Sequence, residues 1–116
     1  MKVQAIESHP QQPVQMEGAQ NVKMRMLIGR ADGAANFHMR HFEVGVGGHT
    51  PHHAHPYEHE VLILSGNGVV RSPQGDRPIK AGDVVFVPAD ERHQFVNGGT
   101  GPLTFLCLIP APQECA

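Results

Sequence analysis

The chain has 116 residues, a formal net charge of −2 at pH 7 and 17% charged residues. That length suits one domain that buries a core without disulfide help. The charge balance provides no basic surface for nucleic acid, and no apolar run approaches the roughly 20 residues that a membrane helix needs. The N-terminus, MKVQAIESHP, lacks the apolar core of a signal peptide. We therefore expect a cytoplasmic protein that binds neither nucleic acid nor membranes.

The elements expected in the first part of the chain are strands, because glycine and proline interrupt it often and no helical period is present. Residues 1–21 are polar and rich in Pro and Gln, which favours a loose arm or an edge strand packed on a neighbouring subunit. Residues 22–30, VKMRMLIGR, alternate apolar and polar side chains, with Val22, Met24, Met26 and Ile28 on the apolar face. Residues 37–44, FHMRHFEV, form the next expected strand, which we expect the glycines of 45–48 to end.

The remaining expected strands are EVLIL (60–64), VVR (69–71), DVVFVP (83–88), HQFV (93–96) and LTFLCLI (103–109). About eight short strands without a long repeat suit a sandwich or barrel of jelly-roll type. We therefore predict an all-β barrel over residues 22–110, followed by a C-terminal tail over 111–116. Cys107 lies in an apolar run and is expected to be a buried thiol, whereas Cys115 is expected to be exposed.

Nine histidines are the unusual feature of the composition, and five of them fall between residues 49 and 59. His53 and His55 are separated by one residue, which on an extended strand places both imidazoles on one face, about 7 Å apart at the backbone. His59 follows after a short turn and can return to the same point. His93 can reach that point only if the chain folds back into a closed sheet. Neutral imidazoles suit Mn, Fe, Co, Ni, Cu or Zn and fit Ca or Mg poorly.

The other histidines are expected to have plainer roles. A lone histidine in a strand is usually structural or on the surface, and this applies to His9, His38 and His41. His49 and His52 are expected to be solvated loop residues at the mouth of the barrel.

Two motifs in this chain resemble those of the cupin superfamily. The first motif is Gly, five residues, His-x-His, three or four residues, Glu, six residues, Gly; the second is Gly, five residues, Pro-x-Gly, two residues, His, three residues, Asn. Here the first reads Gly47, His53-Ala54-His55, His59 and Gly66, and the second reads Gly82, Pro88-Ala89-Asp90, His93 and Asn97. The resemblance covers residues 22–110 and implies the single-domain cupin fold, a double-stranded β-helix or jelly-roll barrel.

The chain departs from these motifs at two positions. Asp90 replaces a turn glycine, which is a mild change because Asp tolerates turn conformations. His59 stands where the metal-binding glutamate of the family usually stands. Glu60 is the alternative ligand, but that register shortens the spacing to Gly66 and turns Glu60 to the opposite strand face from His59. We therefore favour His59 as the fourth ligand, which leaves the ion with four neutral ligands and its full charge.

An all-histidine set is similar to that of a subgroup of very small single-domain cupins, which implies manganese, with Fe, Zn, Ni or Cu as alternatives. The likeness extends to MLIGRADGAANFHMRHF, HPYEHEVLILSG and FLCLIP. It implies a substrate pocket lined by Arg40, Phe95, Phe105, Cys107 and Ile109. Alternation does place Phe105, Cys107 and Ile109 on one face of the last strand. The alternative is ordinary barrel core for the apolar residues and a surface charge for Arg40.

The resemblance implies oxygen-dependent chemistry on a small-molecule substrate, such as dioxygenation or double-bond cleavage of a small aromatic compound. In this interpretation Arg40 holds an anionic group, and Glu58 and Glu60 accept hydrogen bonds from the ligand imidazoles. No residue is a clear general base. The alternatives are a non-enzymatic metallo-cupin that binds a small sugar or metabolite, a metal-dependent isomerase or lyase, and a purely structural zinc site. By analogy with cupin barrels we expect a homodimer that exchanges the arm of residues 1–21.

Overall fold

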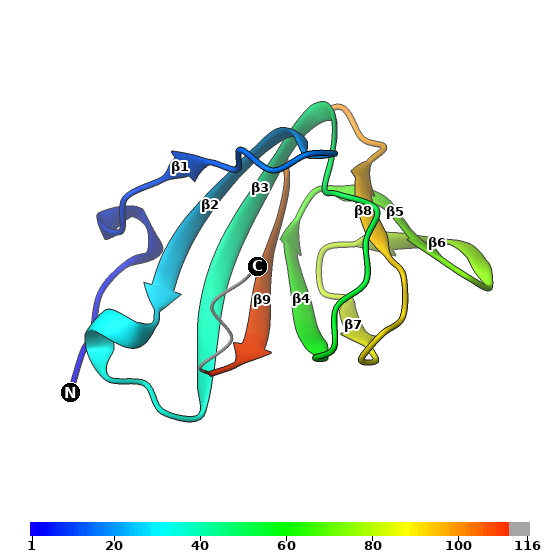
Figure 1. Cartoon of the computed structure of the whole chain (residues 1–116). Helices are drawn as coiled ribbons and strands as arrows, with labels where there is room; N and C mark the ends of the chain where they lie inside the picture. Colours follow the sequence, from blue (N-terminus) through cyan, green and yellow to red (C-terminus); the bar gives the residue numbers. More distant parts are fainter. Residues whose placement is uncertain (112–116) are drawn as a thin grey trace.

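The computed structural model describes residues 1–111, which form antiparallel strands curled into a barrel (Figure 1). Two short 3-10 turns, η1 (Ile6–Ser8) and η2 (Arg30–Asp32), flank the second strand. The strands are β1 (Gln12–Pro13), β2 (Gln20–Ile28), β3 (Phe37–His49), β4 (His59–Ser65), β5 (Asn67–Ser72), β6 (Gly75–Lys80), β7 (Val84–Val87), β8 (Gln94–Asn97) and β9 (Leu103–Pro110). The all-β cupin fold expected from the sequence is confirmed.

The strand β3 organises the sheet, because it pairs with three other strands. The main order is β6-β5-β8-β3-β9-β4-β7, and β2 pairs with β3 and with β1. The first half of β3 pairs with β9, from Phe37 opposite Pro110 to Val44 opposite Leu103. Its last residue, His49, pairs with Val96 of β8. This change of partner bends the sheet and brings β8 across from β4, so that both histidine segments face one interior.

The glycines after residue 44 do not end the strand, as the sequence suggested; β3 continues through them to His49. The register explains why: Val22 lies opposite Val44 and Gln20 opposite His49, so four residues of β3 bulge against Asn21 alone. A Cβ on Gly48 would lie 2.6 Å from the carbonyl oxygen of Gln20. Glycine is therefore needed there for a close approach of two backbones within the sheet.

The side chain of Asn97 holds the other side of this bend. Its Nδ2 donates to the carbonyl oxygens of Val44 and Gly101, both at 2.9 Å, and its Oδ1 accepts from the N–H of Gly99 at 2.8 Å. Asn97 is 6% exposed, so these bonds satisfy polar groups that are shielded from water. The asparagine of the second motif thus has a structural role: its hydrogen bonds connect β3 to the turn after β8.

The alternation predicted for residues 22–30 is only partly correct. Val22 is buried, but Met26 and Ile28 are 43% and 37% exposed, and Leu27 is buried in their place. A shift of register between Met26 and Ile28 reverses the faces at the end of β2. A bulge of one residue has this effect because successive side chains point to opposite faces.

One strand was missed by sequence analysis. The strand β6 pairs with β5 over its whole length, yet its sequence, GDRPIK, is polar and contains Pro78. Proline is tolerated because β6 is an edge strand. The apolar run EVLIL forms most of β4, as expected, and it alternates there, with Val61 and Ile63 inside and Leu62 and Leu64 outside.

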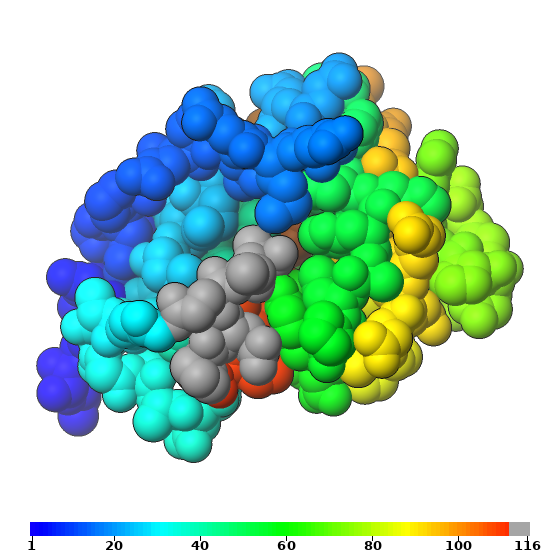
Figure 2. All heavy atoms as spheres, viewed as in Figure 1, coloured from blue at the N-terminus to red at the C-terminus, as the bar shows by residue number. Residues whose placement is uncertain are grey.

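Residues 1–21 pack against the barrel of their own chain rather than forming a loose arm. The strand β1 pairs with β2, Val14 packs on the core, and Lys2 forms an ion pair with Asp32 at 3.0 Å. In Figure 2 this blue segment crosses the barrel and meets the green residues of the β3–β4 loop. The tail expected over 111–116, with Cys115, lies outside the described residues apart from Ala111.

The core fills the barrel between its two faces, with Val44, Ile63 and Leu103 at or below 1% exposure. It extends through aromatic side chains and Cys107 toward the open end of the barrel. Across residues 1–111, no helix reaches the length and apolar character needed to cross a membrane.

Candidate metal centre

A ladder of backbone hydrogen bonds brings the two histidine segments together. After His49 pairs with Val96, Thr50 donates its N–H to the carbonyl oxygen of Phe95 at 2.9 Å, and its Oγ1 accepts from the N–H of Phe95 at 2.9 Å. His53 and His93 then exchange N–H to carbonyl bonds of 3.1 and 2.9 Å. These contacts join residues that are 40 to 47 positions apart, because the chain folds back on itself at β8.

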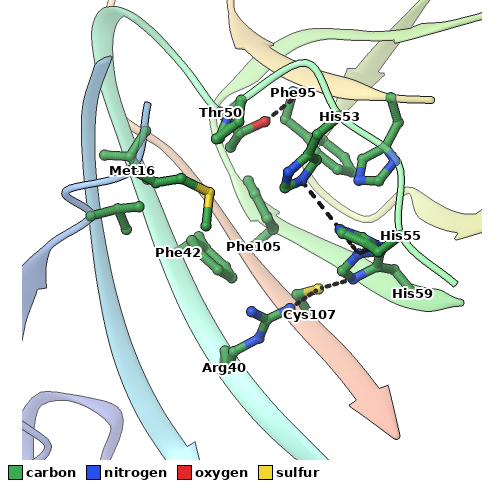
Figure 3. Close-up of a pocket in the computed structure, with 14 residues that line it drawn as sticks. Met16, Arg40, Phe42, Thr50, His53, His55, His59, Phe95, Phe105 and Cys107 are labelled. Atoms are coloured by element: carbon green, nitrogen blue, oxygen red, sulfur yellow. Dashed lines mark hydrogen bonds between the residues drawn. The ribbon is translucent and has the colours of Figure 1, made fainter. Parts of the chain in front are cut away.

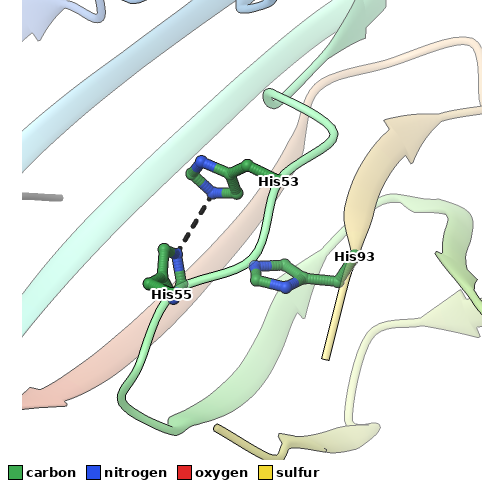
Figure 4. Close-up of side chains that lie close together, drawn as sticks. All are labelled: His53, His55 and His93. Atoms are coloured by element: carbon green, nitrogen blue, oxygen red, sulfur yellow. Dashed lines mark hydrogen bonds between the residues drawn. The ribbon is translucent and has the colours of Figure 1, made fainter. Parts of the chain in front are cut away.

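The segment with His53 and His55 is a loop between β3 and β4. Only His53 has a strand-like partner, in its isolated bridge with His93. Pro51 and Pro56 lack the backbone N–H that strand pairing needs, and β3 ends in a bulge. The loop therefore does not pair continuously with a neighbouring strand. Extended backbone at the bridge still lets both imidazoles point inward (Figure 4).

The ring nitrogens of His53, His55 and His93 lie within 4.8 Å of one another and could hold a metal ion. His55 is at the centre of the cluster: its Nε2 is 3.2 Å from His53 Nε2 and 3.0 Å from His59 Nε2. The ring of His59 also lies 5.1 Å from that of His93, between centroids. Thus the structure brings together all four histidines singled out in the sequence, with His53, His55 and His93 as the tightest group.

These separations fit ligands that share one ion. With metal–nitrogen bonds of about 2.0–2.1 Å, two imidazole nitrogens on one metal are about 2.9–3.4 Å apart, depending on the angle between them. The His55 pairs, at 3.2 and 3.0 Å, fall in this range. The donor set therefore fits a first-row transition metal on geometry alone.

Hydrogen bonds on the outer nitrogens orient two of the rings. His93 Nδ1 lies 2.9 Å from the carbonyl oxygen of Glu91, which can only accept, so Nδ1 carries the proton. Its Nε2 therefore presents a lone pair to the cluster. His59 Nδ1 lies 2.9 Å from the sulfur of Cys107, and this contact fixes the plane of its ring.

Burial keeps the four imidazoles neutral. Burial, followed by the charges of neighbouring histidines and Arg40, lowers the pKa of His59 to about 2, and burial with the neighbouring His53 lowers that of His55 to about 4. Burial also lowers the pKa values of His53 and His93 below the ordinary value. Neutral imidazole is the form that binds a metal, so the cluster needs no deprotonation step at neutral pH.

The metal-free protein should lose stability as the pH falls below 6.5. His59 is 5% exposed and its pKa is about 2, against 6.5 in the ordinary state. Above pH 6.5 both the folded and unfolded forms are neutral, whereas below it the unfolded form binds a proton that the folded form excludes. The free energy of unfolding should therefore fall by up to about 1.4 kcal/mol for each pH unit from this group alone.

Urea unfolding of metal-free protein between pH 7 and 4 measures this loss, with His59→Gln as the control because glutamine does not titrate. The difference between wild type and variant isolates His59 from the carboxylates. Parallel pH profiles for the two proteins would contradict the assignment of a neutral buried His59.

The cluster opens into a pocket at the mouth of the barrel, with a cavity volume of about 60 Å³ (Figure 3). Of the predicted pocket residues, Arg40, Phe95, Phe105 and Cys107 line it. Ile109 does not: it is 3% exposed and belongs to the core beyond Cys107. Alternation put Ile109 on the correct face but could not tell how deep the pocket reaches along β9.

Several pocket residues were not found from the sequence. Phe42 follows Arg40 on the same face of β3, so alternation could have indicated it. Val14 and Met16 come from the N-terminal segment, whose sequence carries no sign that it returns to the metal cluster. The complete set of lining residues missed is Val14, Met16, Val22, Phe42, Thr50 and Pro51.

The structure does not place Glu58 and Glu60 where they could accept hydrogen bonds from the ligand imidazoles, as the sequence suggested. Glu60 is exposed on the outer face of β4, opposite to the buried His59, and Glu58 is exposed in the preceding loop. Within residues 1–111, the outer ring nitrogens of His93 and His59 contact the carbonyl oxygen of Glu91 and the sulfur of Cys107 instead. Strand alternation accounts for this, because His59 and Glu60 are consecutive.

The remaining histidines lie outside the cluster. His9, His38 and His41 are buried elsewhere in the chain, in agreement with a structural role. His52 is exposed in the loop at the barrel mouth. His49 lies at the end of β3, with its Nδ1 3.3 Å from the side-chain nitrogen of Gln94.

Asp90 adopts the left-handed conformation, with φ of 68°, as its place in the second motif predicted. Its N–H donates to the carbonyl oxygen of His55 at 2.7 Å, which ties the turn before His93 to the His55 loop. We expect Asp90→Val to lower the free energy of unfolding by about 1–2 kcal/mol, because a branched side chain is strained at positive φ. Asp90→Gly should change it by less than about 0.5 kcal/mol. Equal effects of the two changes in urea unfolding would contradict this account.

Comparison with known proteins agrees with the fold. The family model Cupin_2, described as a cupin domain, matches residues 40–109. A solved structure of the polyketide cyclase RemF from Streptomyces resistomycificus matches with a TM-score of 0.89 and 33% identity, covering 95% of this chain and 79% of that one.

Two curated proteins match parts of the chain. A 1-methylthio-D-xylulose 5-phosphate methylsulfurylase from Rhodospirillum rubrum is 34% identical over 76 residues, which are 66% of this chain and 49% of that protein. An oxalate-binding protein from Thermotoga maritima is 45% identical over 58 residues, which are 49% of this chain and 48% of that protein. The matched segments thus span about half the length of these curated relatives. The two motifs, the curled sheet and the family match together identify the chain as a member of the Cupin_2 family of cupin domains.

Proposed function

We propose that this protein is a metal-dependent oxygenase that acts on a small aromatic or conjugated substrate, with manganese or iron held by His53, His55, His59 and His93. The observation that carries the proposal is the combination of a four-imidazole cluster with a pocket that lacks a proton-transferring group. Within residues 1–111, the lining of this pocket includes no Asp, Glu, Lys or Tyr side chain. Such a site suits chemistry that a metal and oxygen perform and that needs no acid or base from the protein.

The two other polar side chains at the pocket do not act readily as a base. The Oγ1 of Thr50 already accepts from the N–H of Phe95 at 2.9 Å. Burial raises the pKa of the Cys107 thiol, so it stays protonated at neutral pH. Isomerases and lyases usually need a positioned group that removes a proton. The pocket therefore favours oxygenation over these alternatives.

A redox metal held in this cluster would supply the activation of dioxygen, which amino-acid side chains cannot provide. Cleavage of a carbon–carbon double bond by one dioxygen molecule gives two carbonyl groups, each with one oxygen atom, so the reaction needs no added reductant. The protein's part is to hold the metal through neutral ligands, to orient their rings through Glu91 and Cys107, and to exclude water.

Aromatic side chains give the pocket its selectivity in this proposal. Phe105 stacks between Phe42 and Phe95, with ring centroids 5.4 and 4.8 Å away. The three rings form an apolar stack beside the histidines (Figure 3). Such a stack favours an aromatic or conjugated substrate that packs against it, and it keeps water from the reacting bond.

A redox-neutral conversion is the second candidate, and the likeness to the polyketide cyclase RemF favours it. In that case a metal such as zinc would polarise a carbonyl group, and the same aromatic stack would bind a polyketide chain. A non-enzymatic role in binding a small metabolite is the third. Dependence on oxygen and on a redox-active metal separates the three.

The test is oxygen uptake by protein loaded separately with Mn(II), Fe(II) or Zn(II), with 4-propenylphenol as substrate. We expect the manganese or iron form to consume oxygen and release an aromatic aldehyde in equal amounts, and the zinc form to be inactive. His52→Ala, a change at an exposed histidine of the same loop, is the matched control and should keep full activity. Absence of uptake with either redox metal would overturn the proposal, and turnover that continues without oxygen would favour the cyclase-like alternative.

A further inference from the structure

Arg40 is the most unusual charged side chain of the protein. It is 3% exposed, and it projects from β3 into the pocket beside the histidines (Figure 3). Its Nε has no hydrogen-bond partner, and its Nη2 reaches only the sulfur of Cys107, at 3.3 Å. No carboxylate of residues 1–111 forms an ion pair with it. A buried guanidinium in this state is costly, because burial removes water that nothing replaces.

The groups around Arg40 in the pocket are neutral or positively charged. The sulfur of Cys107 lies 3.3 Å from the Nη2 of Arg40 and 2.9 Å from the Nδ1 of His59. A divalent ion in the cluster would add two more positive charges, and the described lining holds no acidic side chain to offset them. The pocket as a whole is therefore complementary to an anion.

A purely structural role accounts poorly for this arrangement. An arginine that stabilises a core usually pairs with a carboxylate or with several carbonyl oxygens. Arg40 instead has a soft sulfur contact and lies with its Cζ 5.0 Å from the centre of the Phe42 ring. The Phe42 ring contacts one face of the guanidinium, so the N–H groups in the guanidinium plane can still donate hydrogen bonds to a ligand. A carboxylate matches that planar fork and can accept two hydrogen bonds from it.

We propose that Arg40 is the anion-recognising residue of the pocket and that the substrate is a planar aromatic or conjugated carboxylate. Its carboxylate pairs with Arg40, its flat body packs against the stack of Phe42, Phe105 and Phe95, and its far end faces the histidines. The inference rests on the proposed function for its choice of substrate body, since it concerns the same pocket. The recognition of the anion by Arg40 can be tested without any turnover.

The experiment is a ¹⁹F NMR titration of zinc-loaded and of metal-free protein with 4-fluorobenzoate and with its neutral isostere, 4-fluorobenzamide. We expect wild type to bind the benzoate at least about tenfold more tightly than the benzamide, the size of one charge-assisted hydrogen-bonded pair. Arg40→Met should remove that preference and leave benzamide binding within about twofold, because only the charge-assisted pair is lost. Arg40→Lys should keep part of it, since the charge remains and the fork is lost.

The controls separate recognition from folding and from the metal. Arg71→Met removes an exposed arginine that pairs with Asp76, and it should keep the full preference. Arg40→Met should unfold at the same temperature as wild type or higher, because it relieves an unpaired buried charge, and benzoate should raise the melting temperature of wild type alone. If Arg40→Met does not fold, the preference of wild type for the benzoate and the reduced preference of Arg40→Lys still test the inference.

Equal binding of benzoate and benzamide by wild type would overturn the inference, and so would a preference that survives in Arg40→Met. Since the metal-free arm measures Arg40 alone, a protein that binds no metal would defeat the proposed oxygenase without affecting this result. Conversely, oxygen uptake with no preference for carboxylates would leave the oxygenase standing and remove Arg40 from substrate recognition.

Discussion

Replacing His55 by alanine should reduce the affinity of the protein for Mn(II) or Zn(II) by at least about 100-fold, since a structural four-ligand site contributes roughly 10–16 kcal/mol in total. The effect should be the largest of the four histidine changes. His55 Nε2 lies within 3.2 Å of a ring nitrogen of two other histidines, His53 and His59, and its ring lies 5.0 Å from that of His93. Removing it therefore separates the remaining ligands as well as deleting one. His52→Ala, three residues away and exposed, should change the affinity by less than about twofold.

Titration against a fluorescent chelator measures these affinities directly. The pair His59→Ala and Glu60→Ala then decides the fourth ligand. If His59 ligates, its variant loses affinity and Glu60→Ala does not, because Glu60 points out of the barrel. Metal retention by His59→Ala together with loss by Glu60→Ala would show that the register of the first motif is wrong.

The sequence predicted the parts of the site that depend on short spacings. The single residue between His53 and His55, the motif distance to His93 and the alternation of His59 with Glu60 are local features, and they carry through into the structure. His93 is close to His53 because β3 changes partner from β9 to β8 and the chain after it bridges to His93. The two motifs implied this proximity, but the spacing alone did not.

The parts that could not be predicted depend on backbone geometry or on distant segments. The bulge opposite Asn21 turns a set of glycines that suggests a break into a continuous strand. The strand β6 is polar because it lies at the edge of the sheet, so no apolar pattern marks it. Met16 reaches the pocket through the path of the N-terminal segment, which no periodic pattern encodes.

In the sequence, the glycines of the two motifs served only to define the distances between motif residues. The structure shows that they have different physical roles. Gly66 has φ of 82°, and a Cβ there would lie 2.9 Å from the Cα of Leu103 and closer still to the carbonyl oxygen of Pro102. Gly47 has φ of 78° but faces open space. Gly101, which lies outside both motifs and serves as a reference, has neither a positive φ nor a neighbour within 4 Å. The three positions therefore separate backbone strain from steric contact.

We expect Gly66→Ala to lower the free energy of unfolding by about 3 kcal/mol or more, the sum of a strained positive φ and a clash with backbone that cannot rotate away. Gly47→Ala should cost about 1–2 kcal/mol, from the strained φ alone. Gly101→Ala should stay within about 0.5 kcal/mol of wild type, because alanine meets no neighbour there. Urea unfolding of the metal-free proteins measures all three.

The order of the three effects is the informative result. Leu103 is 0% exposed, so a displaced β4–β5 turn at Gly66 would transmit its shift into the centre of the core. If Gly66→Ala and Gly47→Ala cost the same, the contact with Pro102 and Leu103 contributes nothing, and the glycine of the first motif serves the turn conformation alone. A larger cost at Gly66 would mean that this glycine lets the turn pack directly on β9, the strand that also carries Phe105 and Cys107 to the pocket.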